Sequence, residues 1–397
     1  MIHWITYPIA AAIVGYLSWG GPEWVGLAAI IPALWIQAKN RMHAGVIAFT
    51  YYLVGSRCIP ESSVGYFDIN ANYEAGMAMW IAAGALNSLP WALAWSRNSA
   101  WQSITLRMGL VILAITLPPL GLIGWLNPWL GAASLLPGAG WWGVLVGAAI
   151  LIGMAVASKT NPRIATLLTI GILVGQLGTA NNMSTSGIHQ WVAHETQWGE
   201  YPPVGTQQSF DRWAKIASTA EESFKEGATV AVFPEQIVGT WSDSAEIFLR
   251  SYLTKHLESG KILIVGTGIH EHGVSLNAAA IFSKDDTSFF YARQTVPISM
   301  WRPWASQHYP ADWMAPATVT IDGKRVAVSI CYEDFLFGLG LMAFMHDSPQ
   351  MVLSMANAWW AEKSNQIEVQ RLHINTLARI FGVPIVRTIN KPEARTN

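Results

Sequence analysis

Charge is the feature that this sequence has least of. Only 12% of its 397 residues are Asp, Glu, Lys or Arg, whereas about 25% is usual in soluble domains. The deficit is concentrated in the first half, because 11 of the 49 charged residues precede residue 186. With 52% hydrophobic residues in addition, this composition argues against a wholly soluble protein and indicates a membrane domain in the first half.

Cysteine and clustered positive charge are also scarce. The two cysteines, Cys58 and Cys331, lie in different halves, so a disulfide framework is not expected. The net charge of −1, without a basic cluster, argues against a nucleic acid partner. No cofactor or metal is expected. Gly266-Thr267-Gly268 lacks the rest of a dinucleotide fingerprint, and His270-Glu271-His272 lacks a third metal ligand, so both read as ordinary turns or loops.

Seven apolar stretches follow one another in residues 1–186, and we expect each to be a transmembrane helix. They lie at about 4–19, 22–37, 43–58, 75–95, 108–126, 140–158 and 164–180. Several reach the roughly 17–25 residues that cross a bilayer. A single short stretch could instead be a buried helix of a soluble domain, and the first could be a signal peptide. Seven in succession favour a membrane α-helical bundle in which the first helix is retained.

The basic residues predict how this bundle is oriented. They fall in alternate connections: Lys39 and Arg41, then Arg97 and Arg107, then Lys159 and Arg163. Lys and Arg favour the cytoplasmic side of a membrane. Seven spans then place residues 187–397 on the other side, which in a bacterium is the periplasm. We therefore expect a multi-pass protein of the bacterial inner membrane with a periplasmic second half.

From about residue 187, short β-branched runs alternate with helical patterns. We expect strands at 188–192, 229–233, 261–265, 277–282, 287–291, 318–321, 325–330, 351–355 and 383–387. The expected helices are 207–226, 245–259 and 364–381. Two of the strand pairs are separated by short polar turns and read as hairpins. Strands, hairpins and helices in this mixture predict a layered α/β sandwich.

Three of these strands are followed by residues with complementary chemistry. Glu235 ends one short motif, Arg293 follows another strand, and Cys331 follows a third. Covalent acyl transfer through cysteine requires such a set: a carboxylate that takes the thiol proton, a cation that stabilises negative charge, and a sulfur that carries the acyl group. Taken singly, Cys331 could be an inert buried cysteine and Glu235 a solvated turn residue.

Four motifs in this order resemble the nitrilase superfamily of carbon–nitrogen hydrolases. They are Phe233-Pro234-Glu235, the Ser-Ile-Cys-Tyr-Glu run at 329–333, Asn357-Ala358-Trp359-Trp360, and the helix with its following strand at 366–388. Membrane helices followed by such a domain resemble apolipoprotein N-acyltransferase. The resemblance covers nearly the whole chain, and it implies a membrane α-helical bundle at 1–186 followed by a nitrilase-like αββα sandwich at 187–397.

The resemblance also implies roles for individual residues. Cys331 matches the family nucleophile and Glu235 the general base. Arg293 stands where the family has a catalytic Lys, if the chain is aligned on Tyr291. Glu333 matches a second carboxylate that orients the site, although it could equally form a surface salt bridge. The backbone N–H of Tyr332 would help to hold the oxyanion, and Asn357 and Trp359 belong to a supporting segment.

Several positions depart from the family pattern. Arginine cannot donate a proton as a tuned lysine can, and an alignment on Val-Pro would put Ala292 at the lysine position instead. Met300 replaces a family Glu, and Asn390-Lys391-Pro392 replaces Asn-Asn-Gly. We also expect the final strands and the eighth membrane helix of the acyltransferases to be missing. A loop with Trp301, Trp304 and Trp313 is either ordinary packing or a lid that contacts lipid.

The resulting prediction is a membrane-bound acyltransferase. It would move an acyl chain from a phospholipid through a cysteine thioester to an amine acceptor such as a lipoprotein N-terminus. Relatives of this kind also serve plasmid conjugation, so a role in conjugal transfer is included. The alternative is a catalytically reduced nitrilase-like membrane protein that binds acylated partners in conjugation or envelope assembly. Hydrolysis of small polar amides or nitriles is disfavoured, because it requires no membrane helices.

Overall fold

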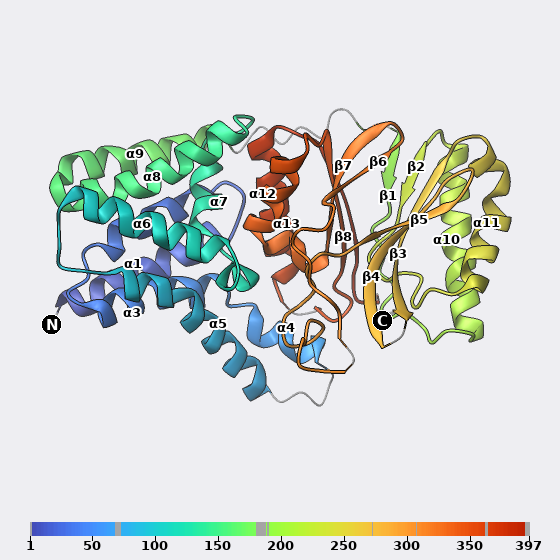
Figure 1. Cartoon of the computed structure of the whole chain (residues 1–397), viewed down its shortest axis with the longest axis horizontal. Coiled ribbons are helices and arrows are strands. Elements are labelled where there is room, and N and C mark those ends of the chain that lie inside the picture. Colours follow the sequence, from blue (N-terminus) through green and yellow to red (C-terminus); the bar gives the residue numbers. More distant parts are fainter. Residues whose placement is uncertain are drawn as a thin grey trace. The chain divides into compact units, whose positions relative to one another are not determined.

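The chain forms two compact units in the computed structural model (Figure 1). The structure describes residues 2–67, 73–179, 188, 190–271, 273–306, 308–361 and 364–393. The first unit comprises Met1–Ser184, Phe335–Gly338 and Lys363–Val383, and the second comprises Thr185–Asp334, Leu339–Glu362 and Pro384–Asn397. The domain boundary predicted at residue 186 lies outside the described residues.

The first unit is helical throughout its described part. Its elements are α1 (Ile2–Ser18), η1 (Val25–Ile30), α2 (Ile31–Trp35), α3 (Arg41–Gly55), α4 (Ile59–Tyr66), α5 (Tyr73–Ala94), α6 (Trp101–Thr116), η2 (Leu120–Ile123), α7 (Pro128–Ala133), α8 (Trp141–Thr160), α9 (Pro162–Thr179) and α13 (Gln366–Phe381). Each of the seven apolar stretches is at least partly helical. The second contains only η1 and α2, which together are shorter than a membrane span requires.

Among the described residues, two helices are long and apolar enough to cross a membrane. They are α5 and α8. The other apolar helices have 10–17 residues by the same criterion. The helical character of the first half is therefore observed, while a bundle of seven spans stays a prediction.

Aromatic side chains connect the helices of this unit by hydrogen bonds. Trp19, the residue after α1, donates from its Nε1 to the Tyr51 hydroxyl of α3 over 3.0 Å, and that hydroxyl donates to the carbonyl of Leu126 over 2.9 Å. Trp35 Nε1 of α2 donates to the carbonyl of Trp91 in α5 over 2.7 Å. Because an unpaired polar group in an apolar interior is costly, these bonds fix how the helices pack.

The second unit contains two β-sheets. The first has the order β1-β2-β3-β4-β5 and the second the order β6-β7-β8-β9. The strands are β1 (Trp191–Ala193), β2 (Val230–Val232), β3 (Ile262–Glu271), β4 (Val274–Phe282), β5 (Thr287–Tyr291), β6 (Thr318–Ile321), β7 (Lys324–Ile330), β8 (Met351–Asn357) and β9 (Ile385–Asn390). Strands β1, β2 and β3 run parallel, as do β7, β8 and β9, and each sheet ends in an antiparallel hairpin.

Alternation along the strands explains the layers. In β2, Val230 and Val232 join a buried cluster that also contains Val328 and Leu353 of the other sheet. Ala231 points to the opposite face and joins a cluster with side chains of α10 (Gln207–Lys225) and α11 (Asp243–Glu258). Because successive strand residues face opposite sides, the two sheets pack against each other, and α10 and α11 cover the outer face of the first (Figure 1).

The predicted α/β domain is confirmed, and all of its strands and hairpins are present close to their expected positions. The sequence missed one helix, α12 (Phe337–His346), and underestimated β3, which continues to Glu271. Helix α13, which we expected within the sandwich, belongs to the first unit. The second helical layer of an αββα sandwich therefore stays a prediction.

Candidate active site

The candidate residues follow or end parallel strands of the two facing sheets, so the packing of one sheet on the other brings them together. Glu235 follows β2, Cys331 follows β7, Asn357 ends β8 and Asn390 ends β9. In sheets of this kind, ligands bind beyond the carboxyl ends of the parallel strands. The nucleophile and the base that the sequence predicted thus lie where such a fold places its chemistry.

Glu235 is held by two amides from other strands. The side chain is 4% exposed. Asn277 Nδ2 of β4 donates to Glu235 Oε1 over 2.5 Å, and Asn357 Nδ2 donates to the Glu235 carbonyl over 3.1 Å. A Cβ atom at Gly266 in β3 would collide with the backbone at Pro234, Glu235 and Gln236, so glycine is required for β3 to approach this turn.

Cys331 lies at a sharp turn between β7 and the 3-10 helix η3 (Cys331–Phe335). Its φ of 56° is in the left-handed region that side chains other than glycine rarely adopt. Such conformations are costly and gather at functional sites. Here the turn presents the thiol to Glu235, with which it forms a hydrogen bond.

The two groups influence each other's protonation. Burial raises the pKa of the Glu235 carboxyl to about 7, although the hydrogen bonds from Cys331 and Asn277 oppose this change. Burial and then the Glu235 carboxylate raise the pKa of the Cys331 thiol well above its usual range. Near neutral pH the sulfur therefore keeps its proton, and Glu235, whose pKa lies near that pH, is the neighbouring carboxylate that can accept it.

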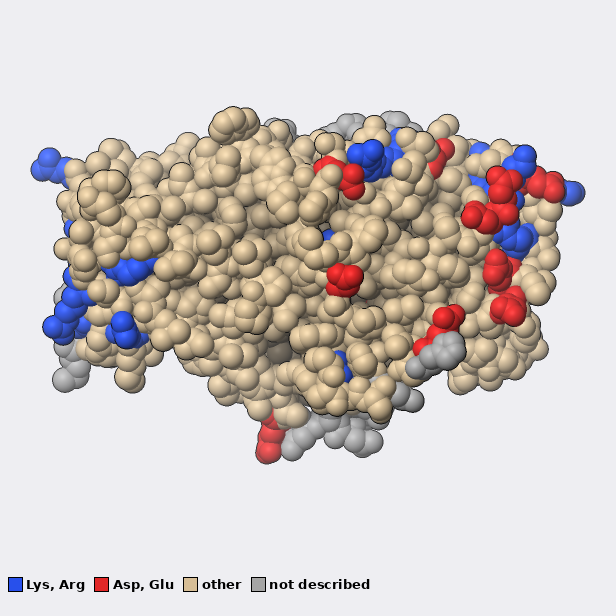
Figure 2. Space-filling view, in the orientation of Figure 1, with Lys and Arg blue, Asp and Glu red and all other residues tan. Residues whose placement is uncertain are grey.

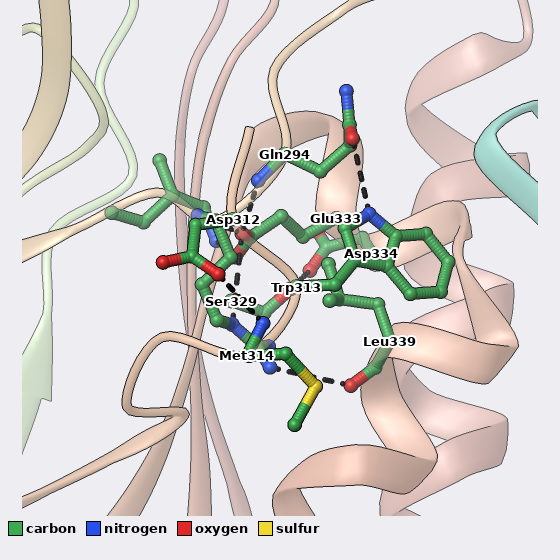
Figure 3. A network of polar contacts seen from close by, with 10 residues as sticks. Gln294, Asp312, Trp313, Met314, Ser329, Glu333, Asp334 and Leu339 are labelled. Atoms are coloured by element: carbon green, nitrogen blue, oxygen red, sulfur yellow. Dashed lines mark hydrogen bonds and ion pairs between the residues drawn. The ribbon is translucent and has the colours of Figure 1, made fainter. Parts of the chain in front are cut away.

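Glu333 is not the surface residue that one reading of the sequence allowed. It is 3% exposed, and its carboxylate accepts hydrogen bonds from three backbone N–H groups: Arg293 at 2.5 Å, Gln294 at 3.0 Å and Ile330 at 3.0 Å. Burial raises the pKa of Glu333, while Arg293 opposes the rise. The carboxylate thus fastens the chain after β5 to the nucleophile turn (Figure 3).

Arg293 is buried, 3% exposed, and pairs with Glu333. Its Nε lies 3.9 Å from Glu333 Oε1, too far for a hydrogen bond, and its Nη1 donates to the carbonyl of Leu339 over 3.4 Å. The charges that act on the Cys331 thiol are those of Glu235 and Asp334. A direct role of Arg293 at the thiol stays a prediction.

The supporting residues form a chain of amides that the sequence only partly indicated. Asn390 Nδ2 donates to Asn357 Oδ1 over 3.1 Å and to the carbonyl of Gly199 over 2.7 Å. Trp359 N–H donates to Asn357 Oδ1 over 3.4 Å. Asn357 in turn holds Glu235, so these bonds orient the base. The Asn-Lys-Pro motif at 390 was visible in the sequence, whereas nothing there singled out Asn277 or Asp334.

The tryptophans of the loop between β5 and β6 differ in exposure. Trp313 Nε1 donates to Gln294 Oε1 over 3.0 Å, and the Trp301 N–H donates to the Val296 carbonyl over 3.0 Å. Trp304 is 70% exposed, and Met314 is 73% exposed. Figure 3 shows Trp313 directed toward Gln294 and Met314 directed away from it. The loop is therefore fastened at Gln294 and presents apolar groups to its surroundings.

The Tyr332 side chain is 6% exposed and follows the nucleophile in η3; the oxyanion role of its N–H stays a prediction. In the described part of the chain, no group of three or more His, Cys, Asp and Glu side chains is placed to hold a metal ion.

Two curated proteins are similar to this chain over nearly its whole length. No family model matches the chain. A protein named "Probable conjugal transfer protein TraB" from Sinorhizobium fredii is 27% identical over 393 residues, which cover 96% of this chain and 97% of that protein. Conjugal transfer protein TraB of Agrobacterium fabrum is 25% identical over 401 residues, covering 95% of this chain and 90% of the relative.

Among solved structures, an amidase of the nitrilase superfamily from Nesterenkonia covers 51% of this chain and 77% of its own, with 12% identity and a TM-score of 0.39. A carbon-nitrogen hydrolase from Helicobacter pylori covers 50% and 72%, with 13% identity and a TM-score of 0.35. The predicted likeness to conjugal transfer relatives is confirmed: the chain is similar over nearly its whole length to TraB conjugal transfer proteins. Its structural neighbours include carbon–nitrogen hydrolases of the nitrilase superfamily.

Proposed function

We propose that this chain is a membrane-bound cysteine acyltransferase that acts in conjugal transfer. It takes an acyl chain from a phospholipid onto Cys331 and passes it to an amine acceptor such as a lipoprotein N-terminus. The observation that carries the proposal is the pair formed by the Cys331 thiol and the buried Glu235 carboxylate, whose pKa of about 7 suits proton transfer at neutral pH.

The reaction has two balanced halves. Cys331 attacks the ester carbonyl while Glu235 takes the thiol proton, and the leaving glycerol oxygen then receives that proton from Glu235. An amine next attacks the thioester, Glu235 accepts a proton from the nitrogen, and the released sulfur recovers it. In this proposal, the Tyr332 N–H helps to hold the oxyanion in both halves. In this scheme, Arg293 acts through Glu333 by fixing the turn.

Membrane association is supported by the surface of the helical unit. In α9, Ile164, Leu167, Ile170 and Leu173 follow one another along half of the helix circumference and are between 42% and 68% exposed. Soluble monomers rarely expose continuous apolar areas of this kind. In the same proposal, the exposed Trp304 and Met314 of the β5–β6 loop, together with Trp301 and Trp313, form a lid that contacts acyl chains.

The distribution of basic residues supports the proposed orientation. The Arg41 Nε atom donates to the Trp95 carbonyl over 3.3 Å, and Gln37 Nε2 donates to the Ser158 carbonyl over 2.7 Å. The three basic connections therefore lie close together, and Figure 2 shows the blue atoms of this unit gathered at its left end. Positive residues at one end favour a cytoplasmic position for that end.

Topology reporters test this orientation. Fusions near Lys39, Arg97 and Lys159 are expected to report the cytoplasm, and those near Ser62 and Ala133 the periplasm, because only that arrangement puts the basic loops inside. Fusions after residue 186 are also expected in the periplasm. A cytoplasmic reading for the second half would contradict the lipid substrate, because the thiol would then face the other leaflet.

The pH dependence tests the acid–base pair. The acylation rate of Cys331 is expected to rise as pH increases through about 7, because Glu235 must lose its proton before it can accept the one on sulfur. Glu235→Gln should remove this rise and slow acylation by about 10²–10⁴-fold. The measurement is the rate of thioester formation with a phospholipid, at a series of pH values. A rate in the wild-type protein that does not vary with pH would exclude Glu235 as the base.

The decisive experiment is mass spectrometry of the purified protein for a thioester-linked acyl chain on Cys331. The alternative function is binding of acylated partners without turnover. This alternative is supported by Arg293, the cation expected at the thiol, because it pairs with Glu333 instead. A protein that never carries an acyl chain on Cys331, with phospholipid present, would favour this alternative.

A further inference from the structure

Asp334 is a third buried carboxylate at the nucleophile turn, and neither the reaction scheme nor the family motif uses it. It lies three residues after Cys331 in η3 and is 4% exposed. Its Oδ1 accepts a hydrogen bond from Ser329 Oγ at 2.6 Å, and its Oδ2 accepts one from Ser354 Oγ at 2.8 Å. Figure 3 shows Asp334 directed toward Ser329.

The two serines are partners across neighbouring strands. Ser329 of β7 lies directly opposite Ser354 of β8 in the parallel register. Both are buried, at positions where a strand inside a sandwich normally carries apolar side chains. The carboxylate therefore joins β7 to β8 immediately before the turn that presents Cys331, and two hydroxyl donors satisfy the oxygens of its ionised form.

Hydroxyl groups are neutral, so these bonds stabilise the ionised carboxylate without cancelling its charge. That charge acts on both reacting groups: it adds to the effect of burial in raising the pKa of Glu235 and that of Cys331. Glu333, in the same 3-10 helix, is paired with Arg293. Tyr309 also faces Glu235, and burial raises its pKa to about 12, so it is neutral.

We propose that Asp334 is a positioning residue of the Glu235–Cys331 site, which fixes the nucleophile turn through Ser329 and Ser354 and supplies a constant negative charge to the reacting pair. The catalytic part of this proposal rests on the acyltransferase function proposed above. A negative charge here keeps the proton on sulfur until substrate arrives and makes Glu235 a stronger base. The charge thus suppresses side reactions of a free thiolate.

The test measures thiol reactivity and needs no acyl substrate. The full chain in detergent is treated with iodoacetamide over a range of pH, and alkylation of Cys331 is quantified by peptide mass spectrometry. Asp334→Asn keeps the size of the side chain but removes its charge. We expect its alkylation profile to move to lower pH by about one unit, which at a fixed pH below the midpoint is about tenfold faster alkylation.

Two variants serve as controls. Asp286→Asn removes an exposed carboxylate at the opposite end of β5 from Tyr291 and should leave the profile unchanged. Asp334→Glu keeps the charge and should restore a profile close to that of the wild type. If Asp334 had only a structural role, Asp334→Asn would change the thermal stability but not the pH dependence of Cys331 alkylation. A well-folded Asp334→Asn protein whose alkylation has an unchanged pH dependence would therefore overturn the proposal.

A second variant keeps the proposal testable if Asp334→Asn does not fold. Ser329→Ala combined with Ser354→Ala removes the two serine donors, so the buried carboxylate should bind a proton more readily and lose negative charge at a given pH. This double variant is expected to shift the profile in the same direction, and an unmoved profile would again overturn the proposal. The two proposals can fail separately. If the alkylation profile shifts but the wild-type protein never carries an acyl chain, the acyltransferase function is rejected and the charge effect of Asp334 is retained.

Discussion

Cys331→Ser is expected to abolish the acyl adduct while leaving the fold intact. The hydroxyl has nearly the shape of the thiol, so the left-handed turn and its hydrogen bond to Glu235 can persist. A serine hydroxyl is far less acidic than a thiol, and a carboxylate with a pKa of about 7 cannot activate it as efficiently. Intact-protein mass spectrometry after incubation with phospholipid should therefore detect no added acyl chain.

Cys58→Ser is the matched control for this experiment. Cys58 is the other free cysteine, and it lies buried in the helical unit, beside the start of α4. Its replacement should leave the acyl adduct intact. An adduct that persists in Cys331→Ser at any position would remove Cys331 from the mechanism, and one that disappears in Cys58→Ser would show that the chain is acylated elsewhere.

The ends of the strands were the most predictable part of the site. Short β-branched runs before Glu235 and Cys331 indicated buried strands, although these two strands belong to different sheets. The motifs around the two residues then identified their chemistry. Each of these signals is local in the sequence, so the strand positions and the identities of the two residues required no knowledge of long-range packing, whereas their approach depends on how the two sheets pack.

Other features depend on distant contacts and could not be predicted. Asn277 reaches Glu235 only because β3 and β4 pair in a particular register. Helix α12 is a ten-residue apolar segment with two glycines, which local patterns do not distinguish from a strand. The positive φ of Cys331 carries no sequence signal, because glycine is the residue that normally marks such a conformation.

At Arg293, the motif alignment predicted the residue type but not its contacts. The sequence indicated that a cation follows β5, and a buried arginine is found there. Which group the cation pairs with depends on the turn between Ala292 and Gln294, where the backbone N–H of Arg293 itself binds Glu333. A motif specifies that a charge is present, whereas the backbone turn decides in which direction its side chain extends.

Replacement of Arg293 should therefore affect stability as well as rate. Arg293→Ala leaves the buried Glu333 carboxylate without its cation, and loss of one partner of a buried pair costs about 3–5 kcal/mol of the free energy of unfolding. Arg293→Lys keeps the charge but loses the hydrogen bond to Leu339, a loss of about 1 kcal/mol. Chemical denaturation of both variants measures these costs, and we expect Arg293→Lys to retain acylation.

A double variant separates a structural from a catalytic contribution. Combining Arg293→Met with Glu333→Gln removes both charges, so no uncompensated buried charge remains, and the protein should be more stable than Arg293→Ala alone. If Arg293 acts through Glu333, acylation per folded molecule should recover along with stability. A folded double variant that acylates about 10²–10³-fold more slowly would instead show that the guanidinium stabilises the oxyanion directly. The binding-only alternative makes a different prediction, since neither single nor double replacement would change partner binding unless the turn itself were displaced.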